Sequence, residues 1–161
     1  MAVSVVYALN ETIVETLPGN TGSAPDASRK VTHTNYDVNG TLASGTTPPA
    51  TLCALFPLVL SSGAATIDLR ALVGTNAAVI DGNGLRPQIV RFKNLGANVM
   101  TVATGASNGH NFFTSGGAKV FPGSAMEIVS NDGGEDIDAT HKTWDVTGTG
   151  SQTMEVTVVL G

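Results

Sequence analysis

A Gly-x-Ser-x-Gly segment is the first place in this chain where residue types and spacing suggest a reaction. Gly105-Ala-Ser-Asn-Gly109 matches the pattern, and His110 follows it directly. In α/β-hydrolases the serine of this motif is a nucleophile on a turn between a strand and a helix. Here residues 111–114 have no helical period, and the chain lacks the alternation of strands and helices. We therefore predict a hairpin loop and assign no catalytic residue.

The acidic segment Asn131-Asp-Gly-Gly-Glu-Asp-Ile-Asp138 is a second candidate site. Its carboxylates are hard oxygen ligands of the kind that Ca²⁺ prefers. Their order does not match an EF-hand loop, which requires its own sequence of Asp, Asn and Gly with a distal Glu. We interpret the segment as a solvated turn and assign no metal site, and calcium binding is left as an open alternative.

The remaining metal-ligating residue types are few and dispersed. His33, His110 and His141 lie far apart in the sequence and form no His-x-x-His pair, so with a single cysteine they complete no zinc set. We expect each histidine on a polar strand face or in a loop. Cys53 has mostly apolar neighbours, which predicts a buried structural thiol, and a lone cysteine forms no intramolecular disulfide.

Cofactor and sugar sites are also disfavoured. Gly82-x-Gly84 and Gly148-x-Gly150 lack the third glycine and the following helix of a dinucleotide site, so no cofactor is predicted. A carbohydrate-binding module is an alternative for a small β-protein, but it presents aromatic rings to the sugar, and aromatic residues are only 5% of this chain. The sole tryptophan, Trp144, is therefore expected in the core.

Composition limits the partners. The 161 residues suffice for one domain with a sizeable core. The net charge is −5 and the eight basic residues are scattered, which argues against nucleic-acid binding. The longest apolar run, residues 52–60, contains a proline and is too short for a membrane span. Charged residues make up 13%, about half the usual share. This low share of charge fits a protein that packs against copies or partners. It fits equally well a stable β-protein whose surface is neutral and polar.

The second half of the chain reads as short strands separated by Gly, Asn and Asp turns. In the strand at 88–93, Arg91 and Lys93 share one face by alternation. Strands at this spacing are typical of a β-sandwich or barrel. The predicted strands are residues 88–93, 99–104, 118–121, 125–130, 143–146 and 152–160.

The first half contains more loop. We predict a strand-like arm over 2–17, an exposed loop over 18–28, a strand over 30–38 with a turn at Asn39-Gly40, and a loop over 43–51. Residues 52–60 are expected to form a buried strand or an irregular crossing segment. A strand over 64–72, with a weak signal for a helical turn at 69–73, and a tight turn over 81–84 follow.

These elements predict an all-β fold: an antiparallel β-sandwich, jelly-roll-like, with an extended N-terminal arm. We expect a single domain over residues 1–161, with 1–50 as the loop-rich arm region and 51–161 as the core. An enzyme is not expected.

Five segments of the chain resemble small β-sandwich, jelly-roll-like virion proteins of tailed bacteriophages, the capsid decoration (cement) proteins and related structural proteins. The resemblance is one of strand and turn pattern, and it brings no catalytic residues. It covers about 60% of the chain and is carried by residues 66–72, 84–94, 97–104, 122–128 and 147–159.

This resemblance implies a virion protein that is made in the host cytoplasm, forms a homotrimer or another homo-oligomer, and binds the major capsid protein. Neither nucleic acid nor membrane is an expected partner. The alternatives are another phage structural component (tail, fibre or head fibre) and a ligand-binding or adhesion module. We also expect residues 2–17 to cover a neighbour's strand edge by β-augmentation, so that deletion of residues 1–17 impairs oligomer or particle binding.

Overall fold

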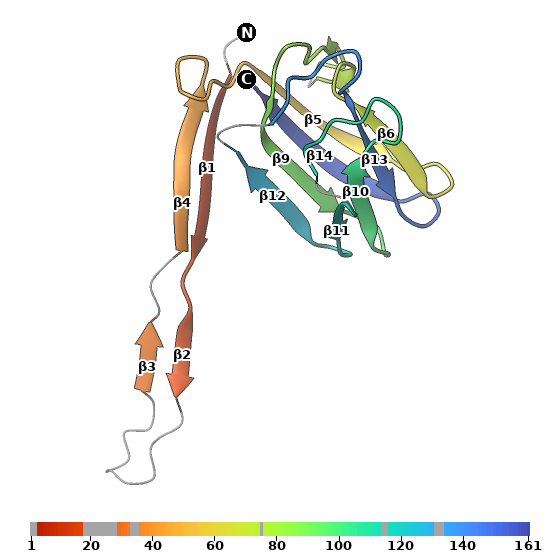
Figure 1. The fold of residues 1–161 in the computed structure, drawn as a ribbon. Coiled ribbons are helices and arrows are strands. Elements are labelled where there is room, and N and C mark those ends of the chain that lie inside the picture. Colours follow the sequence, from red (N-terminus) through yellow and green to blue (C-terminus); the bar gives the residue numbers. More distant parts are fainter. Residues whose placement is uncertain (1–2, 18–28, 33–35, 75, 114–115, 131–133) are drawn as a thin grey trace. The chain divides into compact units, whose positions relative to one another are not determined.

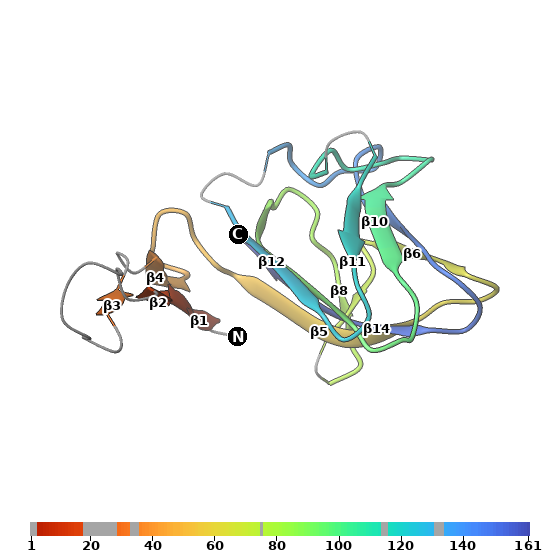
Figure 2. The same ribbon diagram turned by 90° about the horizontal axis from the view of Figure 1, so that it is seen from below.

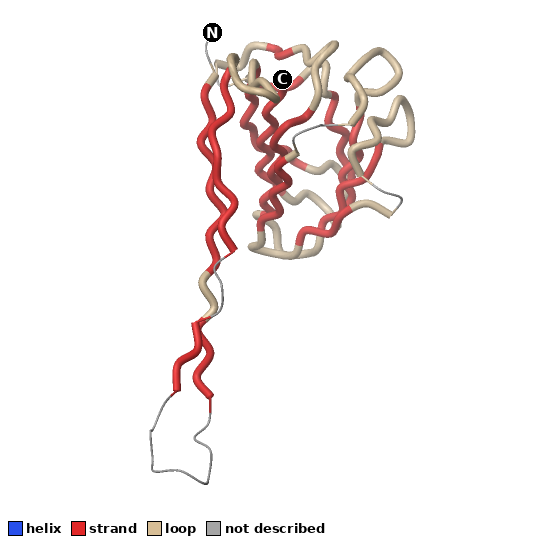
Figure 3. The backbone as a smooth tube through the Cα atoms, turned by 60° about the vertical axis from the view of Figure 1, so that its left-hand side comes forward, coloured by secondary structure: helices blue, strands red, loops and turns tan. Residues whose placement is uncertain are grey.

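The computed structural model describes residues 3–17, 29–32, 36–74, 76–113, 116–130 and 134–161. All regular structure in these ranges is β-strand, which confirms the all-β prediction (Figure 3). The contacts divide the chain into two compact units. The first, called the core unit below, is Met1–Ser4 with Leu42–Gly161, and the second, Val5–Thr41, is called the arm.

Two four-stranded sheets build the core unit (Figure 1). Every neighbouring pair in them is antiparallel, which confirms the predicted antiparallel sandwich. The first sheet has the order β12-β9-β14-β5, with β5 (Leu52–Val59), β9 (Pro87–Asn94), β12 (Ala125–Val129) and β14 (Thr153–Leu160). The second has the order β11-β10-β13-β6, with β6 (Ala64–Asp68), β10 (Met100–Thr104), β11 (Ala118–Val120) and β13 (Thr143–Thr147).

The core lies between the two sheets, which Figure 2 shows as facing layers. Side chains alternate between the two faces of a strand, so every second residue faces the core. Along β14, Met154, Val156 and Val158 are buried, while the residues between them are partly exposed. Buried apolar residues of the second sheet, such as Val102 and Val146, belong to the same cluster. One shared apolar layer therefore holds the sheets together.

An aromatic group fills one part of this layer. Trp144 is fully buried, which confirms its expected core position. Its ring lies edge-on to Phe92 and to Phe113, with centroids 6.1 and 5.4 Å away. These arrangements match the quadrupole preference of aromatic pairs.

The strands predicted from residue 87 onward are confirmed to within one residue at each end. The predicted loop over 43–51 is also confirmed, because β4 (Tyr36–Ala43) ends and β5 begins at its borders. Arg91 and Lys93 share the outer face of β9, where Arg91 lies 3.5 Å from Glu155. Of the segment 52–60, residues Leu52–Val59 form the regular strand β5.

The strand predicted over 64–72 is wrong beyond Asp68. The Asp68 side chain accepts a hydrogen bond from the Arg70 amide (2.9 Å), and the Asp68 carbonyl accepts one from the Ala71 amide (2.9 Å). These bonds form a turn that ends β6, and no helical turn follows. The chain then makes a small ribbon of β7 (Leu72–Val73) and β8 (Val79–Ile80).

The arm contains two two-stranded sheets. Strand β1 (Ser4–Glu11) pairs with β4, and β2 (Val14–Leu17) pairs antiparallel with β3 (Arg29–Thr32). The strand-like prediction for residues 2–17 is therefore confirmed over the described part. The predicted loop over 18–28 lies outside the described residues.

The turn predicted at Asn39-Gly40 is wrong, because both residues lie inside β4. A Cβ atom on Gly40 would stand 2.5 Å from the Tyr7 hydroxyl oxygen. The glycine therefore allows the tyrosine ring of the paired strand to lie against the backbone, a common reason for glycine within a strand.

Candidate functional site

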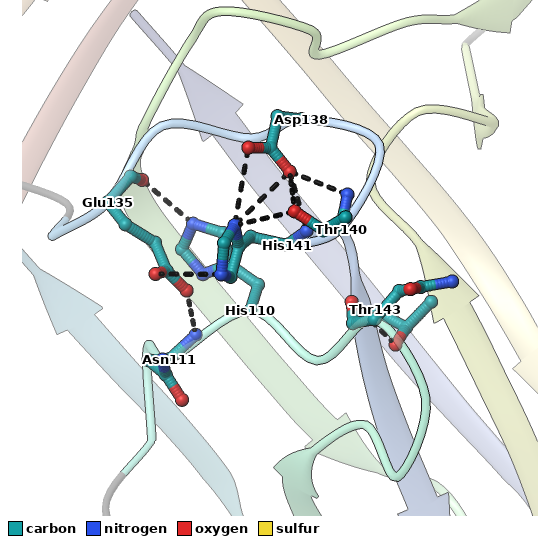
Figure 4. A network of polar contacts seen from close by, with 8 residues as sticks. His110, Asn111, Glu135, Asp138, Thr140, His141 and Thr143 are labelled. Atoms are coloured by element: carbon teal, nitrogen blue, oxygen red, sulfur yellow. Dashed lines mark hydrogen bonds and ion pairs between the residues drawn. The ribbon is translucent and has the colours of Figure 1, made fainter.

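Loops from the two sheets meet around His110, which comes from the β10–β11 connection. The imidazole is fully buried and lies edge-on to Trp144, with centroids 6.0 Å apart. Its Nε2 atom is 2.9 Å from the backbone carbonyl oxygen of Glu135, which belongs to the β12–β13 connection (Figure 4). His110 thus lies in a loop, as expected, but its ring is buried and anchors two loops to the core.

The protonation state of His110 follows from this environment. Burial lowers its pKa, and this effect outweighs the hydrogen bond with Glu135 and the attraction of nearby carboxylates. A carbonyl oxygen only accepts hydrogen bonds, so Nε2 carries the proton and donates it. The neutral Nε2–H tautomer is the state that the core accommodates, with Nδ1 buried and unpartnered.

A second histidine, His141, lies in the same network. Its Nε2 atom is 3.7 Å from Glu135 Oε2, and its Nδ1 atom is 3.2 Å from Asp138 Oδ1. The other carboxylate oxygen of Glu135 accepts a hydrogen bond from the Asn111 backbone amide (2.6 Å). Glu135 therefore joins the His110 loop to the His141 loop through both its backbone and its side chain (Figure 4).

Asp138 organises the turn that precedes β13. It accepts hydrogen bonds from the Thr140 amide (2.6 Å), the Thr140 hydroxyl (2.9 Å) and the His141 amide (2.7 Å). The bonds from Thr140, and after them the His141 side chain, hold the Asp138 pKa far below its ordinary value. A carboxylate that accepts several bonds within its own turn is a local cap of the loop.

Glu135 and Asp138 both approach His141, but each described carboxylate of the acidic segment also has a partner of its own. Glu135 accepts from Asn111, Asp136 lies 2.6 Å from Arg86 Nε, and Asp138 closes its own turn. No group of three or more metal-ligating side chains is found among the described residues. The network ties loops together, and residues 131–133, with Asp132, lie outside the described part.

The Gly-x-Ser-x-Gly segment is a loop, as predicted. The backbone carbonyl of Asn108 accepts hydrogen bonds from the Lys142 and Thr143 amides, at 2.7 and 2.9 Å. A Cβ atom on Gly105 or Gly109 would collide with Thr143 or with the loop backbone. The two glycines therefore let the loop pack closely on β13, and no helix follows it.

Two further residues singled out from the sequence take less prominent places. We expected a buried thiol at Cys53, but this residue of β5 is only partly buried. Burial still raises the pKa of its thiol, which keeps it protonated at neutral pH. His33 lies outside the described residues.

A shallow groove of about 190 Å³ opens between β5 and the β6–β7 segment. Ligand pockets usually begin at roughly 300 Å³, so this groove is small for an organic ligand. It is lined by Phe56, Pro57, Leu58, Val59, Thr66, Ile67, Asp68, Ala71, Leu72 and Val73.

The arm presents an apolar surface. Val6, Leu9 and Ile13 have 78, 50 and 53% of their surface exposed. A two-stranded sheet buries too little to be stable by itself, so exposed apolar side chains on such a sheet point to an interaction surface.

Sequence reasoning missed the convergence of His110, Glu135 and His141. Their separation in the sequence carried no signal for it, because the strand order decides which loops share an end of the sandwich. Comparison with known proteins finds no matching family model, no matching curated protein and no matching solved structure. No helix in the described ranges is long and apolar enough to cross a membrane.

Proposed function

We propose that this protein is a non-enzymatic structural component of a tailed-phage virion, a capsid decoration (cement) subunit that stabilises the head shell. The observation that carries the proposal is the strand order of the core unit. The β7–β8 ribbon is left out, and the eight strands of the two core sheets are renumbered 1 to 8 in chain order, as β5, β6, β9, β10, β11, β12, β13 and β14. The sheet orders are then 1-8-3-6 and 2-7-4-5.

This order has a simple geometric meaning. First pairs with last, second with seventh, third with sixth and fourth with fifth, as β5 with β14, β6 with β13, β9 with β12 and β10 with β11. Such nested pairing is a long antiparallel hairpin rolled into two sheets, which supports the jelly-roll interpretation. Jelly rolls are recurrent in viral capsid proteins.

The surface of the chain supports the same role. The low charge content and the apolar arm suit a subunit that is covered by other subunits. In this proposal the chain is made in the host cytoplasm, assembles with copies of itself, and binds the major capsid protein on the virion. Nucleic acid, membrane and cofactors have no part in it.

The second candidate is another phage structural component (tail, fibre or head fibre) or a ligand-binding or adhesion module. The same strand order also fits the binding module, because lectin domains use the jelly roll. Copy number on the particle distinguishes the two phage candidates.

Peptide mass spectrometry of gradient-purified particles from the source culture tests both candidates. The copy number is measured relative to the major capsid protein. A decoration subunit follows the symmetric lattice, so we expect a signal on the order of hundreds of copies per particle. Roughly tens of copies would favour the tail or fibre candidate. Absence from particles would overturn the virion proposal and leave the binding module.

A further inference from the structure

The two sheets of the core unit end in four edge strands, β5, β12, β6 and β11. An exposed edge presents unpaired backbone groups and recruits other chains unless it is interrupted or covered. In an antiparallel strand, alternate residues direct their N–H and C=O groups toward the partner, and those between direct them outward. The hydrogen bonds therefore show which residues form each free edge.

The β5 edge is interrupted. The Leu60 amide donates to the Gln152 carbonyl (2.8 Å), so even-numbered residues of β5 face β14 and odd-numbered residues face outward. Pro57 is one of the outward-facing residues. Because proline has no N–H, an added strand would lose a hydrogen bond in the middle of this edge.

The two edges of the other sheet offer few free backbone groups. On β6 the Ala64 amide donates to the Ser61 carbonyl (3.1 Å) and the Asp68 carbonyl accepts from the Ala71 amide (2.9 Å). Both ends of β6 are thus tied into turns. The other edge strand, β11, has three residues.

The β12 edge has no such interruption. The Ser130 amide donates to the Gln88 carbonyl (2.8 Å) and the Asn94 amide to the Ser124 carbonyl (2.9 Å). Even-numbered residues of β12 therefore face β9, and Ala125, Glu127 and Val129 direct their backbone groups outward. The strand contains no proline and is regular over its whole length.

The charge on this edge selects its partner. Glu127 is the central residue of β12 and is exposed. Antiparallel pairing of the full length of β12 with the β12 of another copy would set Glu127 opposite Glu127, and like charges directly opposite each other are destabilising. A strand without negative charge in its paired segment avoids this repulsion.

The arm contains such a strand. From Ser4 to Asn10, β1 has no charged residue, and this run is longer than the five-residue β12. The sheet formed by β1 and β4 has only two strands and exposes Val6 and Leu9. We propose that the β12 edge of one copy accepts β1 from the arm of a second copy by β-augmentation, which makes the four-stranded sheet continuous with the neighbour's arm. This inference goes beyond the virion role and does not depend on it.

Sedimentation velocity of the full chain tests the proposal. Glu127→Pro removes one outward-facing N–H and no hydrogen bond to β9, so it blocks the edge. We expect wild type to be an oligomer and Glu127→Pro to be a monomer at the same concentration. Glu127→Ala keeps the N–H and is expected to remain oligomeric. Leu55→Pro makes the same change on the interrupted β5 edge and is the matched control.

The fold of each variant is checked by near-ultraviolet circular dichroism and thermal melting, so that a misfolded variant is recognised. A monomeric wild type, or a folded Glu127→Pro variant that stays oligomeric, would overturn the proposal. Loss of the oligomer in Leu55→Pro as well would assign the effect to proline insertion in general.

Crosslinking identifies the strand and the chain that occupy the edge. In a Cys53→Ser background, Val6→Cys and Glu127→Cys are placed on separate chains, mixed, and treated with a short bis-maleimide. We expect a crosslinked heterodimer, and a much weaker one when Leu55→Cys replaces Glu127→Cys. Crosslinking only when both cysteines lie on one chain would overturn the second copy as the occupant, because the arm would then cover its own core.

Discussion

His110 is a buried base in a protein with few charges, and its burial has a consequence for stability. Because burial lowers its pKa in the folded chain, the unfolded chain binds more protons at mildly acidic pH. The stabilisation is fully present above the unfolded pKa of about 6.5 and declines as the pH falls below it.

Replacement of His110 by glutamine tests this reasoning. Glutamine keeps a donor for the Glu135 carbonyl but stays neutral at every pH. We expect the unfolding free energy of wild type to fall more steeply than that of His110→Gln between about pH 6.5 and pH 5. Urea denaturation across this range measures both slopes, and parallel curves would contradict the assignment.

Asp138 gives a pH dependence in a separate window. Its pKa in the folded chain is lowered, mainly by bonds from Thr140, so its stabilisation is present above the unfolded value and is lost as the pH falls through the folded one. Asp138→Asn should be clearly less stable than wild type at about pH 7, and the difference should shrink as the pH falls below the unfolded carboxyl pKa of about 3.9.

A neighbouring carboxylate provides the control for this change. Asp136 is exposed and pairs with the side chain of Arg86 at the surface. Its replacement by asparagine should change the unfolding free energy by no more than about 1 kcal/mol, as for other exposed ion pairs. If thermal melts show equal losses for Asp136→Asn and Asp138→Asn, the loop-capping role of Asp138 is wrong.

Pro57 hinders the pairing of other chains with the free edge of β5. The residue interrupts the free edge of β5, and it does so at a position where no bond to β14 is lost. Pro57→Thr should restore an outward N–H and increase self-association, while the stability of the monomer changes by no more than about 1 kcal/mol.

Light scattering during concentration measures this association. Val59→Thr is the matched control, because it lies on the same outer face of β5 and leaves the edge amides unchanged. Equal scattering from Pro57→Thr and wild type would show that the proline has no protective role.

The strands of the core were predictable because their signals are local. Period-two alternation and turn residues fixed β9, β10 and β12–β14 to within one residue, and the same alternation placed Trp144 inside. Where a local signal has two physical causes, prediction was wrong. Asn39-Gly40 has the composition of a hairpin turn, but Gly40 serves the close approach of Tyr7.

The candidate site was less predictable because it depends on strand order. His110 and His141 belong to different loops, and they meet at Glu135 only because β10 and β13 are neighbours in one sheet. Nothing in the spacing of these residues encodes that neighbourhood. The identity of the free edge was hidden for the same reason, since it follows from which strand is outermost and which of its amides face outward.

At the scale of the whole molecule, the two units should differ in their local stability. The core unit has a closed apolar layer, whereas the arm has two-stranded sheets with exposed apolar side chains. Hydrogen exchange follows local opening, so amides of β1 and β4 in the dilute chain should exchange much faster than those of β14.

Hydrogen exchange at several protein concentrations then distinguishes an arm that is intrinsically unstable from an arm that is unstable only because its partner is absent. If the arm of a second copy adds to the β12 edge, both surfaces are covered in the same event, and binding stabilises both by mass action. Amides of β1 and the outward-facing amides of Ala125, Glu127 and Val129 should therefore gain protection together as the concentration rises, while those of β14 stay constant. Exchange mass spectrometry with peptide resolution follows all three groups in one experiment. Arm amides that are as protected as β14 at high dilution would contradict this coupling, because the arm would then be stable without a second copy.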